Sequence, residues 1–312
     1  MTWHSGRRAE GKNILVTGAN AGIGYFTAEQ LAANGATVVL GCRDTTKGDL
    51  AVRAIRARVP DARLRCVRLD LSDLSALSVT VGALDVDSLD AIVLNAGILL
   101  SGPDRRMSAH GHELMFATNH LGHFALVAHL APLLAATANS RVITVGSFAA
   151  RSERIDLGDL QSEHDYRPKR TYGRSKLAQM LFGFELDRRL RANAADIASI
   201  VVHPGGALDS LTPSRPPLFV RTTAQRLRGL PAGVALHGKH AAATTIVRAV
   251  LDSEIDGGQL WGPRVFGLRG QPHRETPHAH MTDHDTAAEL WAASAALTDV
   301  DPFVRPSAPT RQ

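Results

Sequence analysis

Residues 14–24 have the sequence ILVTGANAGIG, in which an apolar run of strand length leads into a turn with three glycines. A segment with helical periodicity follows the turn. Glycine lets the backbone bend sharply and approach a ligand closely, and the start of a helix presents free N–H groups to an anion. The spacing G-x-x-x-G-x-G differs from the commoner G-x-G-x-x-G, and three glycines alone would also suit a purely structural turn. Its position between a strand and a helix favours a phosphate-binding turn formed by Gly18, Asn20, Gly22, Ile23 and Gly24.

Apolar runs alternate with helix-period segments through most of the chain. We expect buried parallel strands at residues 13–17, 37–40, 64–69, 91–94, 141–145 and 197–202. Amphipathic helices are expected between them, for example at residues 24–33 and 172–191. This alternation predicts an α/β fold with a Rossmann-type, doubly wound parallel sheet. The sequence contains no internal repeat or linker, so we expect one domain over residues 11–301, with flexible ends at residues 1–10 and 302–312.

Residues 211–231 interrupt this rhythm, because the segment is rich in proline and has no strand pattern. It follows the last central strand, where open α/β sheets hold their ligands. We interpret it as a mobile substrate lid, with a surface loop of no consequence as the alternative.

The composition of the chain indicates where in the cell the protein is located and which kind of ligand it binds. The N-terminus lacks the apolar region of a signal peptide, and no apolar run approaches the roughly 20 residues of a membrane span. Cys42 and Cys66 have no metal or redox spacing, so we expect a cytoplasmic protein without a membrane partner. The net charge of +5 comes almost entirely from scattered Arg residues, without a nucleic-acid motif. These features favour an anionic cofactor over nucleic acid as the ligand.

The end of the second expected strand, Gly41-Cys42-Arg43-Asp44, bears on the identity of the cofactor. In this architecture that position lies beside the adenosine ribose, where an acidic residue would bind the ribose hydroxyls of NAD. Arg43 instead suits a 2′-phosphate, and Lys47 would add a second positive charge one helical turn further on. We interpret Asp44 as the cap of the following helix. The sequence therefore predicts NADP(H) rather than NAD(H).

Tyr172 and Lys176 are four residues apart in a strongly helical segment, so both project from one helix face. A tyrosine is a poor base at neutral pH, and a nearby ammonium group favours its phenolate. The phenol can then protonate a carbonyl oxygen or take a proton from an alcohol. Many helices carry such a pair for surface reasons alone, so the surrounding motifs decide its meaning.

Those motifs occur in a fixed order between residues 11 and 300. After the glycine turn come Asp70, Asn95-Ala96-Gly97, Asn119, Ser147, Tyr172-x-x-x-Lys176 and Pro204-Gly205. In this order the chain resembles a short-chain dehydrogenase/reductase. Three further segments resemble the retinol dehydrogenase-like branch and its bacterial relatives: Asn119-His120-Leu121-Gly122-His123-Phe124, residues 155–161 and His203-Pro204-Gly205. The 25-residue interval between Ser147 and Tyr172 agrees with that branch.

The resemblance implies a role for each motif. Tyr172 would be the acid/base, Ser147 would donate a hydrogen bond to the reacting oxygen, and Asn119 would hold a water that links Lys176 to solvent. Lys176 would lower the pKa of Tyr172 and bind the nicotinamide ribose. The remaining cofactor contacts implied by the resemblance are Asp70 and Leu71 at the adenine, Asn95, Ala96 and Gly97 in the cleft, and Pro204 and Gly205.

The chain departs from the family pattern at two places. Gly146-Ser147 replaces the common Ser-Ser, which retains the hydroxyl that acts. Asp209 falls where the family usually places a threonine that contacts the cofactor. Because a carboxylate close to a pyrophosphate would be repelled, either Asp209 points away or Ser210 takes over the contact.

Histidines near the C-terminus raise the question of a metal site. His278, His280 and His284 lie close together in sequence beside Asp283 and Asp285. We expect no defined helix there to fix them as ligands, and interpret the segment as a solvated turn without a metal.

The leading hypothesis is an NADP(H)-dependent carbonyl reductase (ketoreductase) or alcohol dehydrogenase for an apolar, medium-sized substrate. The alternatives are a double-bond reductase or redox epimerase of the same fold, and a non-catalytic cofactor-binding protein. The predominance of Arg over Lys suggests a GC-rich genome and a role in secondary metabolism. The family resemblance implies a homodimer or homotetramer paired through the two long helices that carry Asn119 and Tyr172, although some members of the branch are monomers.

Overall fold

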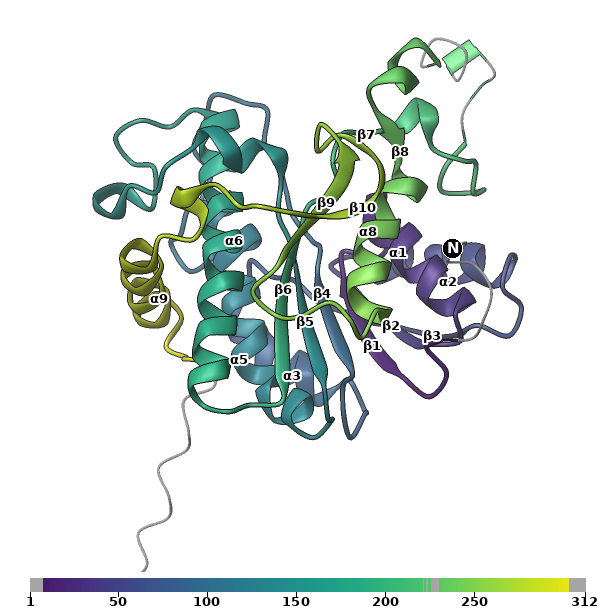
Figure 1. Ribbon diagram of the computed structural model, residues 1–312, viewed down its shortest axis with the longest axis horizontal. Helices are drawn as coiled ribbons and strands as arrows, with labels where there is room; N and C mark the ends of the chain where they lie inside the picture. Colours follow the sequence, from purple (N-terminus) through teal and green to yellow (C-terminus); the bar gives the residue numbers. More distant parts are fainter. Residues whose placement is uncertain (1–7, 221, 223, 226–229, 303–312) are drawn as a thin grey trace, which may run out of the picture.

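The computed structural model of the protein describes residues 8–220, 222, 224–225 and 230–302. Its centre is an eight-stranded sheet with the strand order β10-β9-β6-β5-β4-β1-β2-β3 (Figure 1). The strands are β1 (Asn13–Thr17), β2 (Thr37–Cys42), β3 (Arg63–Arg68), β4 (Ala91–Leu94), β5 (Ser140–Val145), β6 (Ile197–Val202), β9 (Leu260–Val265) and β10 (Arg269–Glu275). Neighbouring strands are parallel except for β10, which is antiparallel to β9. The predicted doubly wound sheet is confirmed, with β9 and β10 as additions at one edge.

Helices cover both faces of the sheet, and each face has its own apolar core. One face packs against α1 (Gly22–Ala33), α2 (Thr45–Arg56) and α8 (Lys239–Leu251). The other packs against α3 (Leu77–Gly82), α5 (Gly122–Ala135) and α6 (Pro168–Ala192). The short α4 (Leu114–Phe116) leads into a π-helical turn, Ala117–Leu121, directly before α5.

Alternating side chains of the central strands divide between these two cores. In β1, Ile14 and Val16 lie in the core under α1, while Leu15 between them lies in the core under α5. All three are at most 1% exposed. Burying one such side chain contributes about 1.5–3 kcal/mol, so the sheet is held firmly from both sides. This explains why the central strands are continuous apolar runs rather than alternating ones.

A further helix, α9 (His284–Thr298), lies on the outer side of α6 (Figure 1). Trp291 of α9 is 3% exposed, and its ring centroid lies 5.0 Å from that of Phe124 and 5.6 Å from that of Phe182. His120 Nε2 lies 2.7 Å from Ser294 Oγ beside this aromatic cluster. Helix α9 therefore occupies part of the outer surface that α5 and α6 would otherwise present.

The segment that contains the predicted lid begins and ends in a small two-stranded sheet. In this sheet β7 (Ala207–Leu208) is parallel to β8 (His237–Gly238). Between them, buried Arg215 forms two hydrogen bonds to Glu29 of α1, at 2.5 and 2.8 Å. The ring of Phe219 packs 5.1 Å from that of Phe26. The first part of the segment is therefore fixed on α1, while residues 221, 223 and 226–229 of the predicted lid lie outside the described residues.

The predicted flexible ends lie mostly outside the described residues too. Ala9 is an exception, because it is fully buried and its N–H donates to the Asn34 carbonyl at 3.0 Å. Across the described part of the chain, no helix combines the length and hydropathy that a membrane span requires.

Candidate active site

A cavity of about 750 Å³ lies at the carboxyl ends of β1, β2 and β4. The sequence-predicted residues that line it are Gly18, Asn20, Gly22, Ile23, Arg43, Lys47, Asp70, Leu71, Asn95, Ala96, Gly97 and Tyr172. These residues come from five separate stretches of sequence and meet around one cleft, which we call the main cleft. Gly41, Leu69, Leu99, Thr118 and Lys239 also line it and were not predicted.

The glycine turn forms an open cradle at one wall of the main cleft. Gly18 and Gly22 have positive φ angles of 67° and 59°, which side chains rarely adopt. A Cβ atom on Gly22 would meet nothing within 4 Å, so the missing side chain leaves open space at the start of α1. A Cβ atom on Gly24 would lie 2.5 Å from the Gly18 carbonyl oxygen. Gly24 therefore allows the close packing of the turn and does not line the cleft. Ala21, the N-cap of α1, provides no side-chain hydrogen bond, which leaves the first helical N–H groups available to a phosphate.

Two exposed cations lie at the adenosine end expected for the main cleft. Arg43 directly follows β2, and Lys47 lies in the first turn of α2. Asp44 caps α2, as predicted, by accepting a hydrogen bond from the Lys47 N–H at 3.1 Å. That bond, together with the Lys47 ammonium group at 3.4 Å, lowers the pKa of the Asp44 carboxyl. The carboxylate is thus occupied within the helix cap, while the Arg43 guanidinium remains beside the cleft.

Tyr172 and Lys176 lie one turn apart in α6 and differ in environment. Tyr172 is half-buried and lines the main cleft, whereas Lys176 is 4% exposed beneath it. The Lys176 ammonium group donates to the Val145 carbonyl oxygen at 2.5 Å and to Gln179 Oε1. Burial lowers the pKa of Lys176 to about 7. Lys176 therefore changes its charge near neutral pH, close to the tyrosine that it would activate.

Asn119 lies in the π-helical turn before α5 and is fully buried. Its Oδ1 accepts from the Ile98 N–H at 2.8 Å, and its Nδ2 donates to the Ile98 carbonyl and to Ser175 Oγ at 3.0 and 2.9 Å. Single π turns inside helices often mark functional sites. Here the side chain of Asn119 links the segment that follows Gly97 to α6.

A buried hydrogen-bond chain that sequence reasoning missed extends from Lys176 to β1. Gln179 Nε2 donates to the Leu94 carbonyl at 3.0 Å and lies 3.1 Å from His123 Nδ1. His123 Nε2 lies 3.0 Å from Thr17 Oγ1, directly before the glycine turn. Burial lowers the pKa of His123 to about 3, so the ring is neutral at physiological pH. No sequence motif joins these residues; only the fold brings them together.

Ser147 lies at the end of β5, where its Oγ accepts from the Ala149 N–H at 3.2 Å. It lines a second, polar cavity of about 330 Å³ with Arg151, His203 and Glu275 rather than the main cleft. Glu275 accepts from Arg151 at 2.8 Å and lies 3.0 Å from His203 Nε2. In this structure Ser147 and Tyr172 thus face two different cavities.

Pro204 and Gly205, predicted as cofactor contacts, do not line the main cleft. The Pro204 carbonyl lies 2.8 Å from His237 Nε2, and a Cβ on Gly205 would lie 2.5 Å from the Leu268 carbonyl oxygen. Both residues shape the turn after β6. Asp209, the second departure from the family pattern, pairs with Lys239 at 2.5 Å.

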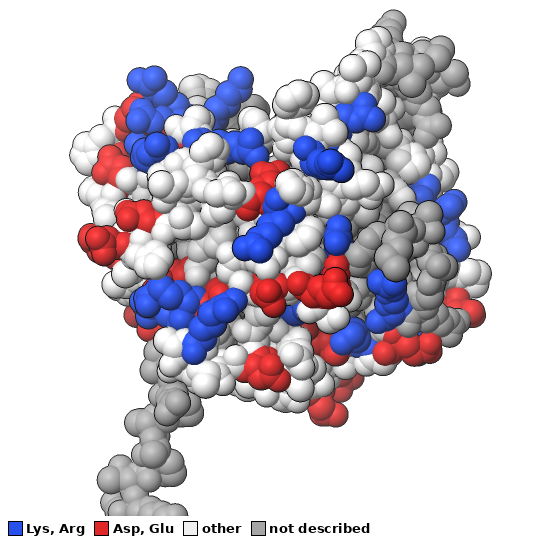
Figure 2. All heavy atoms as spheres, in the orientation of Figure 1, with Lys and Arg blue, Asp and Glu red and all other residues white. Residues whose placement is uncertain are grey.

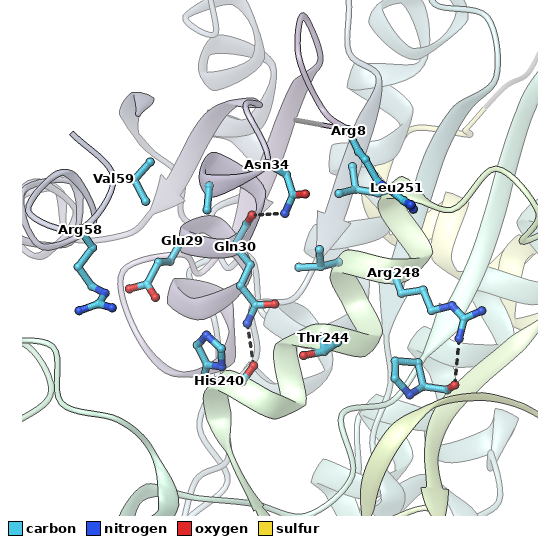
Figure 3. Close-up of a pocket in the computed structure, with 13 residues that line it drawn as sticks. Arg8, Glu29, Gln30, Asn34, Arg58, Val59, His240, Thr244, Arg248 and Leu251 are labelled. Carbon is cyan, nitrogen blue, oxygen red and sulfur yellow. Dashed lines mark hydrogen bonds between the residues drawn. The ribbon is translucent and has the colours of Figure 1, made fainter. Parts of the chain in front are cut away.

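A third cavity of about 660 Å³ lies between α1 and α8 (Figure 3). Arg58, Glu29 and His240 line it, and Gln30 Nε2 donates to the His240 carbonyl at 2.7 Å across its floor. It contains none of the predicted site residues. On the face seen in Figure 2, basic and acidic side chains are interspersed.

The C-terminal histidines differ from the sequence expectation in one respect. We expected no defined helix there, but His284 begins α9, which Asp283 caps by accepting from the Thr286 N–H at 3.3 Å. The rings of His278 and His280 stack 5.8 Å apart. Within the described residues, no three His, Cys, Asp or Glu side chains are grouped so that they could hold a metal.

Comparison with known proteins places this geometry in a family. A family model for short chain dehydrogenases matches residues 12–159. Human retinol dehydrogenase 13 is 32% identical over 302 residues, which cover 95% of this chain and 87% of that protein. Mouse polyprenol dehydrogenase is 35% identical over 296 residues, covering 92% and 84%.

A solved structure agrees with these relatives. The crystal structure of an uncharacterized protein from Mycobacterium paratuberculosis matches with a TM-score of 0.76 and 32% identity, over 95% of this chain and 96% of that one. The predicted resemblance to the retinol dehydrogenase-like branch is thereby confirmed. The chain belongs to the short-chain dehydrogenase/reductase family.

Proposed function

We propose that the protein transfers a hydride between NADP(H) and the carbonyl or alcohol carbon of an apolar, medium-sized substrate. Membership of the family makes the chain an oxidoreductase with a nicotinamide cofactor. The observation that carries the proposal is the placement of Tyr172 on the main cleft, one helical turn from buried Lys176.

The residues present fit such a cofactor. The open cradle at Gly22 and the uncapped start of α1 suit a diphosphate. Arg43 and Lys47 suit a 2′-phosphate, because a guanidinium group binds phosphate oxygens in pairs. Asn95, Ala96 and Gly97 form the wall that continues toward Tyr172, where the nicotinamide would lie.

The bound cofactor supplies or accepts the hydride. Tyr172 gives its phenolic proton to the carbonyl oxygen in reduction and takes it back in oxidation. Lys176, one helical turn away in α6, would bind the nicotinamide ribose. Ser147 donates a hydrogen bond to the reacting oxygen, and Asn119 supports the relay from Lys176 toward solvent. For Ser147 to do so, the substrate must connect the main cleft with the second cavity.

Exposed apolar side chains beside these cavities support an apolar substrate. Leu99 lines the main cleft and is 56% exposed, while Phe148, next to Ser147, is 42% exposed. Large apolar side chains that a fold leaves exposed at a cleft often contact ligands. Reduction of a ketone or aldehyde is the favoured direction, since NADPH supplies reducing equivalents. A role in secondary metabolism is part of this proposal.

The position of α9 bears on the proposed oligomer, and the two cysteines bear on the proposed cellular location. Because α9 covers part of the α5 and α6 surface, we propose that a homodimer or homotetramer, where formed, uses other surfaces. Both cysteines are free thiols, which suits the reducing cytoplasm.

The proposal is tested by following NADPH absorbance with a panel of apolar ketones, aldehydes and quinones. Turnover with NADPH, and weaker turnover with NADH, is the expected result. Tight NADPH binding without turnover of any carbonyl would instead favour a cofactor-binding protein. Turnover confined to activated double bonds would favour a double-bond reductase.

A further inference from the structure

An ion pair at the rim of the main cleft is not used by the proposed catalytic groups. Lys239 Nζ lies 2.5 Å from Asp209 Oδ1. Lys239 lines the main cleft together with the glycine turn, whereas Asp209 does not. The side chain of Lys239 is 22% exposed and that of Asp209 is 47% exposed. The lysine is therefore the member of the pair that faces the cofactor site.

The fold fixes this pair through the pairing of β7 with β8. Leu208 is the register partner of Gly238, so Asp209 and Lys239, the next residue on each side, leave the small sheet together. The Lys239 N–H donates to Thr212 Oγ1 at 3.0 Å, which holds the start of α8 against the same segment. The backbone arrangement therefore places Asp209 and Lys239 next to each other.

Helix α8 also packs against the helix that begins at the glycine turn. The ring of His240 lies 5.7 Å from that of Phe26, one turn into α1. Gln30 Nε2 donates to the His240 carbonyl at 2.7 Å. Because Lys239 precedes His240, its side chain starts close to the end of α1 that presents free N–H groups.

The charges of Asp209 and Lys239 would both affect the binding of a dinucleotide. An unpaired carboxylate at Asp209 would repel the diphosphate of a dinucleotide. The ammonium group of Lys239 neutralises it, and its three N–H donors allow it to bind a second acceptor at the same time. A phosphate oxygen is the acceptor that the cleft would provide, since Lys239 shares the cleft with the glycine cradle.

We propose that Lys239 binds the diphosphate of the dinucleotide and that Asp209 positions it for this contact. The inference rests on the proposed function only in requiring a dinucleotide in the main cleft. It does not depend on the preference for NADP(H), because the diphosphate is common to both cofactors.

Binding is measured by titration calorimetry with NADPH, NADH and ADP-ribose, which keeps the diphosphate but lacks nicotinamide and the 2′-phosphate. Lys239→Met should weaken all three ligands by at least about tenfold and to a similar degree, as expected for the loss of a charged hydrogen bond. Lys12→Met is the matched control, since Lys12 pairs with Asp90 at 3.1 Å and does not line the cleft. That variant should bind all three ligands like the wild type.

Asp209→Asn separates a direct contact from simple neutralisation. If Lys239 binds the diphosphate, Lys239→Met still weakens binding about tenfold in the Asp209→Asn background. If Lys239 only neutralises Asp209, the double variant binds as tightly as Asp209→Asn alone, and the inference is overturned. Unchanged affinity in Lys239→Met would overturn it as well. Circular dichroism melting of each variant separates lost contacts from lost folding.

The outcome is distinguishable from failure of the proposed function. A wild-type protein that binds no dinucleotide overturns both. Equal affinity for NADPH and NADH in the wild type, with all ligands weakened in Lys239→Met, removes the NADP(H) preference and leaves the Lys239 contact standing.

Discussion

The Lys176 ammonium nitrogen lies 2.5 Å from the carbonyl oxygen of Val145, two residues before Ser147. This bond joins α6 to the end of β5 and thereby couples the helix that carries Tyr172 to the turn that carries Ser147. The same burial that makes the bond possible lowers the pKa of Lys176 to about 7. The contact between α6 and the end of β5 and the depressed pKa of the lysine thus both follow from the burial of Lys176.

The depressed pKa of Lys176 predicts a specific dependence of stability on pH. Between pH 7 and the ordinary lysine pKa of 10.5, the unfolded chain keeps this proton and the folded chain loses it, so folding becomes more favourable as pH rises. The difference in unfolding free energy between wild type and Lys176→Met should rise from pH 7 to 8.5, with a slope approaching about 1.4 kcal/mol per pH unit. Urea unfolding at four pH values measures it. A difference that stays constant across this range would show that the lysine is charged in the folded protein.

Arg43 should determine the preference between cofactors. Arg43→Asp removes the partner of the 2′-phosphate and places a carboxylate near it, so NADPH affinity should fall by roughly tenfold to a hundredfold. NADH affinity should change little or improve, because an acid there can bind ribose hydroxyls. Fluorescence titration of both cofactors gives the ratio. Arg53→Asp, in the last turn of α2 and away from the main cleft, is the matched control. An unchanged NADPH to NADH ratio in Arg43→Asp would refute the prediction of NADP(H).

Gln179 should act as a positioning residue for Lys176. Its Oε1 accepts from Lys176 Nζ, and its Nε2 holds the Leu94 carbonyl at 3.0 Å. Gln179→Leu should lower kcat by about tenfold, since a hydrogen bond to a charged group is lost, while cofactor affinity stays unchanged. Gln179→Glu should keep the acceptor, restore most of the activity and raise the pKa of Lys176, because an opposite charge favours the ammonium form. The pH profile of kcat would show this as a displaced limb. Identical profiles in both variants would leave Gln179 with a packing role only.

The buried pair Arg215–Glu29 should hold the start of the predicted lid on α1. Glu29→Gln leaves the buried Arg215 guanidinium without its carboxylate partner. The free energy of unfolding, either of this segment or of the whole protein, should therefore fall by about 3–5 kcal/mol. Limited proteolysis should then cleave within residues 211–231 much faster than in the wild type. The exposed pair Arg65–Asp85 provides the control, since Asp85→Asn should cost at most about 1 kcal/mol. Equal protease sensitivity of the two variants would mean that the buried pair does not anchor the segment.

Much of the fold could be predicted because its signals are local. The central strands are continuous apolar runs, and each of the six predicted strands begins and ends within two residues of its predicted position. The strands β9 and β10 were missed because each contains a proline, Pro263 or Pro272, and because β10 contains no Val, Ile, Leu, Phe, Tyr or Trp. Prolines normally argue against a strand, and at a sheet edge they are tolerated.

The candidate site, too, could be predicted only where its residues belong to local sequence motifs. Residues in the glycine turn and around Tyr172 could be predicted because short motifs carry them. Lys239 and the chain from Gln179 through His123 could not, because their meaning depends on contacts between segments far apart in sequence. For Asp209, the sequence showed a departure from the family pattern, but only the pairing of β7 with β8 shows its partner.

Single-turnover oxidation of NADPH by Tyr172→Phe, with a carbonyl substrate of the wild type, tests the acid/base role of Tyr172 most directly. The variant should bind NADPH as tightly as the wild type and transfer hydride about 10²–10⁴ times more slowly, because the proton donor is lost while the cleft is intact. Hydride transfer at the wild-type rate with NADPH bound would contradict the assignment of Tyr172 as the proton donor.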